Sequence, residues 1–269
     1  MKLTGKWVVI TGGSSGIGFA IASALSKRNN RVTLVAENEV RLRDAKSKLD
    51  ANGANVDVIR CDFGAAGQID ALSDEILSAG APDVLINNAG FAVYRSFEAS
   101  DTIEIDRLLD VNLIGHVKLT KRLLAPMVAR RSGAICFMAS IAGRLPITPN
   151  AMYCGAKHGM LGLASALREE LKRFNIEVTA ICPGRVETPF FDHETFRSRQ
   201  KRPETKGIIS AQRVADSTLR SIERNYRVTY VPGYLQAISW AFETFPFVLR
   251  PLYNRVVRSR IEGLYAANH

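Results

Sequence analysis

The sequence predicts an α/β fold built on a doubly wound parallel sheet of about seven strands, with helices on both faces. Short apolar runs rich in β-branched residues alternate with segments of helical period along the chain. Strands that are apolar almost throughout, each followed by a helix, are typical of a parallel sheet covered on both sides. A length of 269 residues, 46% of them hydrophobic, suits one large core.

The expected elements alternate in order along the chain. We expect strands at 6–11, 31–36, 55–60, 83–87, 133–139, 176–182 and 227–231, and helices at 17–28, 38–51, 67–78, 102–130, 151–174 and 211–224. No repeat or low-complexity linker divides them, so we expect one domain over 1–232 and a C-terminal extension over 233–269. Ligands of such sheets bind beyond the carboxyl ends of the strands, and the unusual residues of this chain gather there.

Composition narrows the range of partners. The formal net charge is +10, but no nucleic-acid-binding motif accompanies it, so we expect no nucleic-acid partner. The four cysteines form no C-x-x-C pair, which predicts reduced thiols and no metal site. The chain shows no signal-peptide pattern and no run of 18 apolar residues. These features predict a cytoplasmic protein without a spanning helix.

The first expected strand leads into the loop TGGSSGIG, residues 11–18, and then into a helix. Glycines in such a loop permit a tight turn and close approach of the backbone to a pyrophosphate, while the helix N-terminus offers N–H donors. This strand–loop–helix unit predicts a Rossmann-type dinucleotide site. Its candidate residues are Gly12, Ser14, Ser15, Gly16, Ile17 and Gly18.

Carboxylates follow the second and third expected strands. Glu37 is placed to bind the adenosine ribose hydroxyls, whereas an arginine there would accept a 2′-phosphate. Because Ser15 is not basic either, we expect NAD(H) in preference to NADP(H), with Arg41 keeping NADP(H) as the alternative. Asp62 is a candidate acceptor for the adenine amino group, and a helix N-cap is its alternative role.

Several motifs in order make the chain resemble the short-chain dehydrogenase/reductase family over residues 4–232. Besides the glycine loop, the chain has NNAG at 87–90, PGRVETPF at 183–190, and four separate residues in the family's expected places. Those four are Asn112, Ser140, Tyr153 and Lys157. Tyr153 and Lys157 alone would be weak evidence, because any helix places residues i and i+4 on one face.

The resemblance implies an NAD(P)-dependent oxidoreductase that transfers a hydride between nicotinamide and a ketone or secondary alcohol. It implies that Tyr153 is the proton donor, that Lys157 and the oxidised nicotinamide lower the tyrosine pKa, and that Ser140 orients the substrate oxygen. Asn112 would hold a water linking Lys157 to solvent. The cofactor would also contact Asn88, Ala89, Gly90, Tyr153, Lys157, Pro183, Gly184, Val186 and Thr188.

Three neighbouring residues are given no part in this chemistry. We expect no catalytic role for His116 or His158, because the four catalytic residues leave no function for a histidine. Cys154 follows Tyr153 directly and should point to another helix face, so we expect it to pack.

The substrate pocket is expected between two segments. Residues 189–209 have the mixed polarity of a lid, and the segment after Ser140 supplies Leu145, Ile147 and Met152 as apolar wall candidates. The resemblance leaves the substrate open. It also implies a homodimer or homotetramer, because family members commonly pair through the helices predicted at 102–130 and 151–174.

The extension at 233–269 is expected to be helical, amphipathic and basic. Tyr234, Ile238, Phe242 and Phe245 share a stripe at helical spacing. Pro246 and Pro251 are expected to break the helix, and Arg250, Arg255, Arg258 and Arg260 add positive charge. This pattern suits peripheral contact with a membrane. A helix packed on the core or on a second subunit is the alternative.

The extension after Tyr-Val-Pro-Gly is similar to that of the branch near 3-ketodihydrosphingosine reductases and hydroxysteroid dehydrogenases. This similarity implies a lipophilic or long-chain substrate. Glu37 departs from the branch, whose NADP-using members tend to carry arginine there. The alternatives are a soluble β-ketoacyl carrier reductase, a small-alcohol dehydrogenase, or a non-catalytic dinucleotide sensor, which is disfavoured because such proteins usually lose the tyrosine or lysine.

Overall fold

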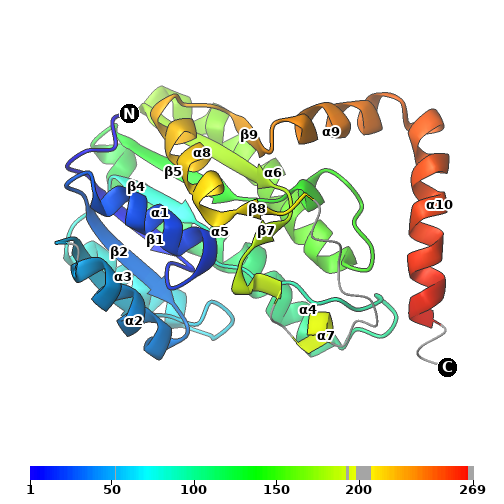
Figure 1. Cartoon of the computed structure of the whole chain (residues 1–269). Coiled ribbons are helices and arrows are strands. Elements are labelled where there is room, and N and C mark those ends of the chain that lie inside the picture. The colour runs from blue at the N-terminus through cyan, green and yellow to red at the C-terminus, as the bar shows by residue number, and fades with distance from the viewer. Residues whose placement is uncertain (52, 192–193, 198–206, 266–269) are drawn as a thin grey trace.

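The computed structural model describes residues 1–51, 53–191, 194–197 and 207–265. Its main sheet has seven strands in the order β3-β2-β1-β4-β5-β6-β9, and every neighbouring pair is parallel (Figure 1). The strands are β1 Trp7–Thr11, β2 Arg31–Ala36, β3 Asn55–Arg60, β4 Val84–Asn87, β5 Gly133–Met138, β6 Ile176–Pro183 and β9 Val228–Val231. The predicted doubly wound parallel sheet is confirmed, and each strand lies within one residue of its expected bounds.

Helices cover both faces of this sheet and enclose two cores. One face is covered by α1 Gly16–Ser26, α2 Glu39–Asp50 and α8 Ala211–Glu223, and the other by α3 Gln68–Ser78, α5 Gly115–Ala129 and α6 Ala151–Leu171. Strand β1 shows how the sequence serves both cores, since Val8 and Ile10 pack into the first and Val9 into the second. Successive strand residues point to opposite faces, so a strand buried on both sides must be apolar throughout.

The strand order reverses between β1 and β4, at the centre of the sheet. From these two strands the chain winds outward in opposite directions, which opens a crevice beyond their carboxyl ends. The glycine loop follows β1, the NNAG segment overlaps the end of β4, and Ser140 and Pro183 come at the ends of β5 and β6. The topology therefore brings the motifs to one edge of the sheet.

The helix predicted over 102–130 is interrupted. Helix α4 Thr102–Leu109 passes through a π-helical turn, η1 Asp110–Ile114, into α5. Within this turn Asn112 donates its Nδ2 to the carbonyl oxygens of Leu108 at 3.0 Å and of Phe91 at 2.9 Å. The side chain thus satisfies backbone carbonyls beside the bulge, which is typical of π-turns at functional sites.

Short elements between β6 and α8 were not predicted. Strand β7 Val186–Glu187 pairs in parallel with β8 Ile209–Ser210, and the short helices η4 Pro189–Phe191 and α7 Glu194–Arg197 lie between them in sequence. A two-residue strand is too short to produce a periodic signal. The remainder of the predicted lid, residues 192–193 and 198–206, lies outside the described residues.

The C-terminal extension forms two helices that meet at a corner (Figure 1). Helix α9 Tyr234–Thr244 follows β9, and α10 Pro246–Tyr265 turns away from it. The break expected at Pro246 is confirmed, because proline fits the first position of a helix. The break expected at Pro251 is wrong, because α10 continues through this residue.

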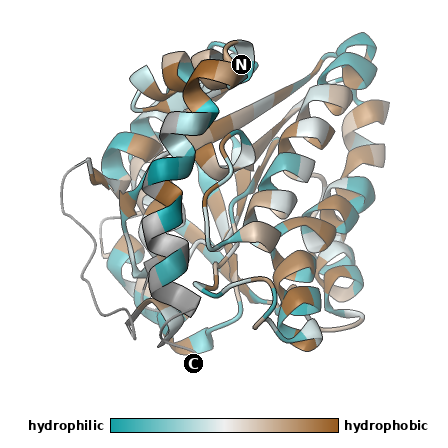
Figure 2. Ribbon diagram, turned by 90° about the vertical axis from the view of Figure 1, so that its right-hand side faces the viewer, coloured by the Kyte–Doolittle hydropathy of each residue, from teal (hydrophilic) through white to brown (hydrophobic). Residues whose placement is uncertain are grey.

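Helix α10 faces the viewer in Figure 2 and carries hydrophilic residues along much of its length. Within the ranges given above, no helix combines the length and apolar character that crossing a membrane requires. The division of the chain into domains at residue 232 remains a prediction.

Candidate active site

The loop after β1 leaves its backbone open to a ligand. Gly12 and Gly16 have φ angles of +64° and +54°, a region that L side chains rarely adopt. A Cβ on Gly18 would lie 2.2 Å from the carbonyl oxygen of Gly12, so glycine is needed where α1 crosses β1. Ser15 makes no capping bond with its side chain in the described structure. The first N–H groups of α1 therefore remain available to an anion.

The segment after β4 holds this loop in place. Asn88 donates its Nδ2 to the carbonyl oxygens of Thr11 at 2.9 Å and Gly12 at 3.2 Å. Thr11 Oγ1 accepts hydrogen bonds from the backbone N–H groups of Asn88 at 2.8 Å and Ala89 at 2.9 Å. Asn88 thus braces the glycine loop, while its neighbours Ala89 and Gly90 line the adjoining cleft.

The two predicted adenosine-binding carboxylates are joined by an arginine. Arg107, on α4, lies 3.2 Å from Glu37 through Nη2 and 2.9 Å from Asp62 through Nη1. Asp62 also accepts from the backbone N–H of Gly64 at 2.8 Å, which is a local turn contact. One guanidinium therefore partly neutralises the charge of both carboxylates.

Ser140 and Tyr153 meet at the opposite end of the cleft. Ser140 follows β5, and its Oγ accepts from the backbone N–H of Ala142 at 3.1 Å, capping the short helix η2 Ile141–Gly143. Tyr153 comes from the first turn of α6, and Ser140 lies close enough to its hydroxyl to influence the pKa of Tyr153. Its ring centroid lies 5.7 Å from that of Phe190. Two hydroxyl groups from different elements thus converge on one point.

Lys157 lies one helical turn after Tyr153 and is 3% exposed. Its Nζ donates to the carbonyl oxygen of Met138 at 3.0 Å and lies 5.5 Å from the centroid of the Tyr153 ring. Burial lowers the pKa of Lys157 to about 8, because an ammonium group is poorly stabilised away from water.

Asn112 faces Lys157 across Gly90. A Cβ on Gly90 would lie 2.5 Å from Asn112 Oδ1 and 3.5 Å from Lys157 Nζ, so a side chain at this position would collide with the site. Asn112 Oδ1 is buried and has no hydrogen-bond partner among the described residues. A buried acceptor without a partner is costly, so this oxygen is one that a bound ligand or water would satisfy.

The pKa of Tyr153 is raised rather than lowered by its surroundings. Burial is the largest cause, and the hydrogen bond with Ser140 opposes it. The predicted lowering by Lys157 is therefore contradicted for the groups of the chain itself. The physical reason is that the cost of burying a phenolate exceeds the stabilisation that one hydrogen bond provides.

These segments line a cleft of about 740 Å³ that runs from the glycine loop to Tyr153. The predicted residues that line it are Gly12, Ser14, Ser15, Gly16, Ile17, Asn88, Ala89, Gly90, Ser140, Tyr153, Lys157, Pro183, Gly184, Val186 and Thr188. Gly18, Glu37, Asp62 and Asn112 are not among its lining residues. Thr188 reaches across the cleft, because a Cβ on Gly16 would lie 3.1 Å from its side chain.

Several cleft residues escaped the sequence analysis. Arg41, noted there only as an alternative phosphate ligand, lines the cleft beside the glycine loop, and Phe190 and Phe196 line its other end. Of the apolar wall candidates, Ile147 lines the cleft. Arg107 carried no motif at all. Its role depends on the Arg107 side chain reaching the residues that follow β2 and β3, which no local pattern reveals.

His116 is buried beneath the NNAG segment and lies outside the cleft. Its Nε2 lies 2.7 Å from the carbonyl oxygen of Ala89, and its Nδ1 lies 3.2 Å from Asn87 Oδ1. Burial lowers the pKa of His116 to about 3, and the nearby charge of Lys157 adds to that effect. His116 is therefore a neutral side chain that positions a loop. His158 is exposed on α6 and contacts the Cys154 carbonyl oxygen at 2.9 Å.

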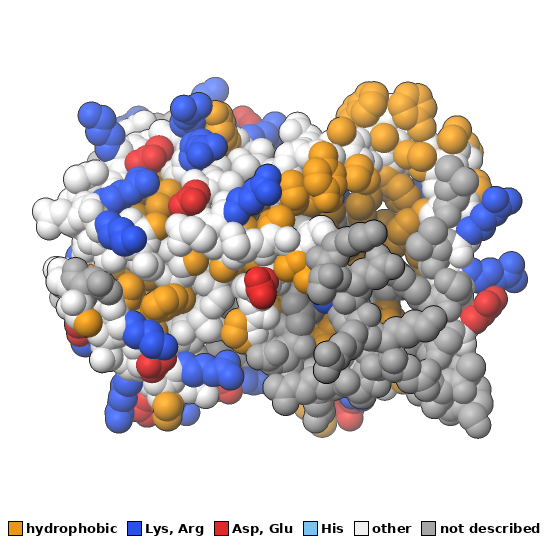
Figure 3. Space-filling model, in the orientation of Figure 1, with side chains coloured by type: hydrophobic (Ala, Val, Ile, Leu, Met, Phe, Trp, Pro, Cys, Tyr) orange, Lys and Arg blue, Asp and Glu red, His pale blue; other side chains and the backbone are white. Residues whose placement is uncertain are grey.

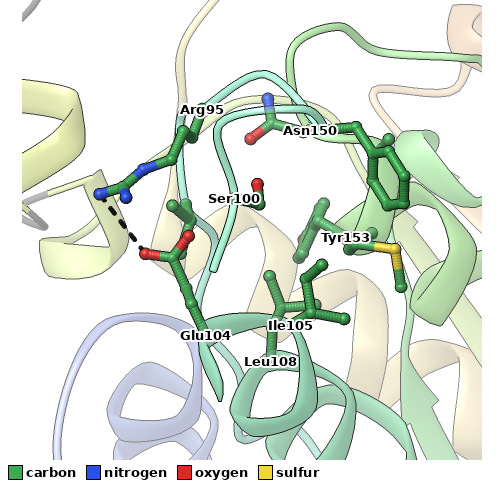
Figure 4. A pocket seen from close by; sticks show the side chains of 11 residues that line it. Arg95, Ser100, Glu104, Ile105, Leu108, Asn150 and Tyr153 are labelled. Atoms are coloured by element: carbon green, nitrogen blue, oxygen red, sulfur yellow. Dashed lines mark ion pairs between the residues drawn. The ribbon is translucent and has the colours of Figure 1, made fainter. Parts of the chain in front are cut away.

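A smaller pocket lies on the other side of Tyr153, between α4 and the start of α6 (Figure 4). Arg95 and Glu104 form an ion pair of 3.6 Å at its edge. Asn150, Ile105 and Leu108 also line this pocket. Met152, a predicted wall residue, lines this pocket instead of the main cleft.

The chain fits a nicotinamide dinucleotide on structural grounds. The glycine cradle offers free helix N–H groups to a pyrophosphate, and the cleft continues from there to the paired hydroxyls of Ser140 and Tyr153. The unpartnered oxygen of Asn112 faces the buried Lys157 at that end. Such an arrangement can hold a dinucleotide and move a proton at the oxygen atom of a second molecule.

Comparison with known proteins agrees with this geometry. Residues 6–198 match the family described as short chain dehydrogenase. The ketoacyl reductase HetN of Nostoc sp. is 32% identical over 222 residues, which cover 82% of this chain and 76% of that protein. The 3-ketodihydrosphingosine reductase of Bos taurus is 32% identical over 242 residues, covering 84% and 71%.

A solved structure is also similar over most of the fold. The short-chain dehydrogenase from Sphingobium yanoikuyae in complex with NADPH superposes with a TM-score of 0.80 at 27% identity, covering 91% of this chain and 94% of that one. The likeness therefore includes both the sheet and the helices around it.

Proposed function

The chain belongs to the short-chain dehydrogenase family, and we propose that Tyr153, Ser140, Lys157 and Asn112 carry its chemistry. The protein is an NAD(P)-dependent oxidoreductase that transfers a hydride between nicotinamide and a ketone or secondary alcohol. The observation that carries the residue assignment is that Ser140, Tyr153 and Lys157 line the same cleft, with Lys157 buried one turn after Tyr153.

A bound nicotinamide would supply or accept the hydride, while residues of the chain donate the proton and return it. Tyr153 donates its phenolic proton to the ketone oxygen as negative charge develops there, and Ser140 holds the same oxygen by a hydrogen bond. Because burial favours the neutral phenol, Tyr153 is protonated and ready to donate. The lowered pKa of Lys157 and the free Oδ1 of Asn112 suit a relay that returns the proton through a water.

We propose a lipophilic or long-chain ketone as the substrate. Ile141, Ile147, Phe190 and Phe196 line the tyrosine end of the cleft, so the surface that meets the substrate is largely apolar. Relatives named 3-ketodihydrosphingosine reductase support the same class. A ketoacyl group on an acidic carrier is the second candidate, supported by relatives named ketoacyl reductase and by the net charge of +10.

NAD(H) is proposed as the preferred cofactor because Glu37 follows β2 and adds negative charge where a 2′-phosphate would bind. Arg41 lines the cleft nearby and is the residue that would accept NADP(H). Glu37→Arg should therefore raise the NADP/NAD ratio of kcat/KM, and Arg41→Ala should lower it. Unchanged ratios in both variants would remove these two residues from cofactor selection.

A homodimer or homotetramer formed through α5 and α6 is proposed for the assembly. Gly155 and Gly162 on α6 have nothing of the described chain within 4 Å of a built Cβ, so a second helix could approach this face closely. Sedimentation of Gly162→Arg should show a smaller species than wild type. A wild-type protein that sediments as a monomer would contradict the assignment.

The function is tested by following cofactor oxidation with ketones of increasing chain length. Turnover should rise with chain length, and Tyr153→Phe should lose about 10²- to 10⁴-fold in kcat, the range for general acid catalysis. Tyr226→Phe is the matched control, since Tyr226 is 41% exposed and is not among the residues lining the cleft. A Tyr153→Phe enzyme as active as wild type would exclude the proposed mechanism. Salt-sensitive turnover confined to carrier-bound substrates would favour the second candidate.

A further inference from the structure

The exposed apolar side chains of this protein gather on one feature. Eleven large hydrophobic residues are exposed in the part of the chain that the structure describes, and six of them fall within residues 234–248. We call residues 234–248 the elbow, since they span α9 and the start of α10. The six exposed residues are Tyr234 at 57%, Ile238 at 45%, Trp240 at 59%, Phe245 at 51%, Phe247 at 94% and Val248 at 64%.

The elbow projects from the body as a corner. Hydrophobic side chains cover it in the space-filling view, over α9 and the first turns of α10, while arginine side chains lie along the outer side of α10 (Figure 3). Trp240 and Phe245 pack edge to face at 5.7 Å, which keeps the aromatic surface together. Patches of this kind on soluble folds usually mark an interaction site.

The charges beside the elbow are almost all positive. Arg250, Arg255 and Arg258 are exposed on α10. Glu243, the one acidic residue in 234–250, is engaged 3.7 Å from Arg144 on the body, and Arg258 lies 3.1 Å from Glu262. An apolar ridge with tryptophan and tyrosine, flanked by arginines, is complementary to the interface of an anionic lipid bilayer.

A second copy of the chain fits this feature less well. In a two-fold contact the same surface faces itself, which would bring the arginines of the two α10 helices towards one another. A convex corner also buries little area against another convex corner, whereas it can enter a deformable lipid surface.

The elbow is attached to the wall of the substrate cleft. Besides the contact between Glu243 and Arg144, the Tyr253 hydroxyl donates to the carbonyl oxygen of Pro146, and the Tyr253 ring packs on Phe242 at 5.4 Å. Residues 144–146 lead directly to Ile147, which lines the cleft. Whatever surface the elbow binds is therefore next to the segment that forms the cleft.

We propose that the elbow docks this protein on an anionic lipid surface, so that the substrate cleft receives its ketone from the bilayer. The second half of this statement rests on the lipophilic substrate proposed above. The docking itself does not, and it can be measured without turnover.

Tryptophan fluorescence gives a direct readout, because Trp7 and Trp240 are the two tryptophans of the chain. The Trp7→Phe variant leaves Trp240 as the reporter. With vesicles of phosphatidylcholine and phosphatidylglycerol, its emission should shift to the blue and be quenched by brominated acyl chains. Phosphatidylcholine alone should give a weaker shift, and added salt should reverse the anionic part. An emission spectrum unchanged by either vesicle would overturn the proposal.

Matched variants separate the elbow from general surface effects. Phe247→Asp should lose at least about tenfold in vesicle affinity, whereas Val40→Asp, which places the same charge on a 78% exposed residue of α2, should bind as wild type. Arg250→Glu with Arg255→Glu should remove the preference for the anionic lipid, and Arg43→Glu with Lys48→Glu on α2 should not. Equal losses in the elbow and α2 variants would refute the assignment.

Two further measurements complete the test. If sedimentation shows a self-association that Phe247→Asp abolishes while vesicle binding is unaffected, the elbow binds a second copy and the proposal fails. For a short water-soluble ketone, Phe247→Asp should keep wild-type kcat/KM. For a long-chain ketone carried in vesicles it should lose activity in step with binding. Vesicle docking without turnover of any ketone would leave this inference standing and contradict the proposed function instead.

Discussion

The nicotinamide end of the cleft and the elbow use similar residues in opposite surroundings. Each brings aromatic rings next to positive charge: Tyr153 with Lys157 in one, Trp240 and Phe247 with arginines in the other. Lys157 is 3% exposed, whereas Phe247 is 94% exposed. Burial shifts the pKa values of the first pair in opposite directions, favouring a neutral phenol and a neutral amine. Exposure leaves the second group as an apolar surface that is free to contact a lipid phase.

The comparison teaches that residue type alone does not assign a role. At the buried end, Lys157 and Ser140 each have a hydrogen-bond partner, and the free oxygen of Asn112 stands out for that reason. At the elbow, the exposed apolar side chains contact one another and solvent. Perturbing the buried end should therefore change rate and pH dependence, while perturbing the link to the elbow should change little within the isolated protein.

The largest effect is expected from Lys157→Met. Activity should fall about 10²- to 10⁴-fold because the proton relay is lost. The folded-state pKa of about 8 lies below the value of 10.5 expected for an unfolded chain, so the unfolded chain binds more protons between these values. The free energy of unfolding of wild type should rise with pH across that window, by up to about 3 kcal/mol.

Urea unfolding at a series of pH values measures this rise. Lys157→Met should lack this rise, and below pH 8 the variant should not carry the free-energy cost of burying an ammonium group. Because other groups titrate in the same range, the informative quantity is the difference in free energy of unfolding between wild type and variant at each pH. Parallel profiles for the two proteins would show that Lys157 is not held at a lowered pKa.

The next effect is expected from His116→Gln, which tests the support beneath the NNAG segment. The folded-state pKa of about 3 lies below the unfolded value of 6.5, so the unfolded chain binds the extra proton between pH 6.5 and 3. Stability should therefore fall as pH falls through this window, by up to about 5 kcal/mol from this residue. Burial is the largest cause of this shift, the hydrogen bond with the Ala89 carbonyl oxygen opposes it, and the charge of Lys157 adds to it.

Acid titration followed by circular dichroism compares wild type with His116→Gln. The variant should start less stable at pH 7, having lost well-aligned contacts to Ala89, but should lose less as the pH falls. His158→Gln on the exposed side of α6 should follow the wild-type curve. An acid sensitivity that persists unchanged in His116→Gln would place its origin elsewhere.

A smaller effect is expected from Gly90→Ala. The new Cβ would lie 2.5 Å from Asn112 Oδ1, so either the asparagine or the loop must move, at a cost of about 1–3 kcal/mol. Gly233→Ala, at the start of the extension, meets nothing within 4 Å in the described structure and should change stability by less than about 0.5 kcal/mol. Thermal unfolding and kcat of the two variants provide the check. Similar values for both would mean that the space around Gly90 is not confined.

The fold and the site motifs could be predicted because their causes are local. Apolar runs specify strands buried on both faces, and TGGSSGIG specifies a turn that few other sequences can make. The link between Arg107, Glu37 and Asp62 could not be predicted, because it joins residues 45 and 70 positions apart. The direction of the Tyr153 pKa shift also depends on burial, which spacing does not reveal. The continuation of α10 through Pro251 depends on where the helix begins.

The smallest effect is expected where the two regions meet, at the ion pair between Arg144 and Glu243. Their side chains are 33% and 52% exposed and lie 3.7 Å apart, so solvent screens most of the attraction. A double-mutant cycle with Arg144→Gln and Glu243→Gln should give a coupling energy below about 1 kcal/mol in urea unfolding.

The single Arg144 variant should cost less than the Glu243 variant, because it also removes a buried Nε that has no hydrogen-bond partner among the described residues. Weak coupling means that the elbow is attached to the cleft wall without being part of its stability, and can follow a lipid surface while the catalytic end stays rigid. A coupling energy above about 2 kcal/mol would instead make the elbow an integral part of the catalytic body, and the contrast between a buried reactive end and an exposed docking feature would no longer hold.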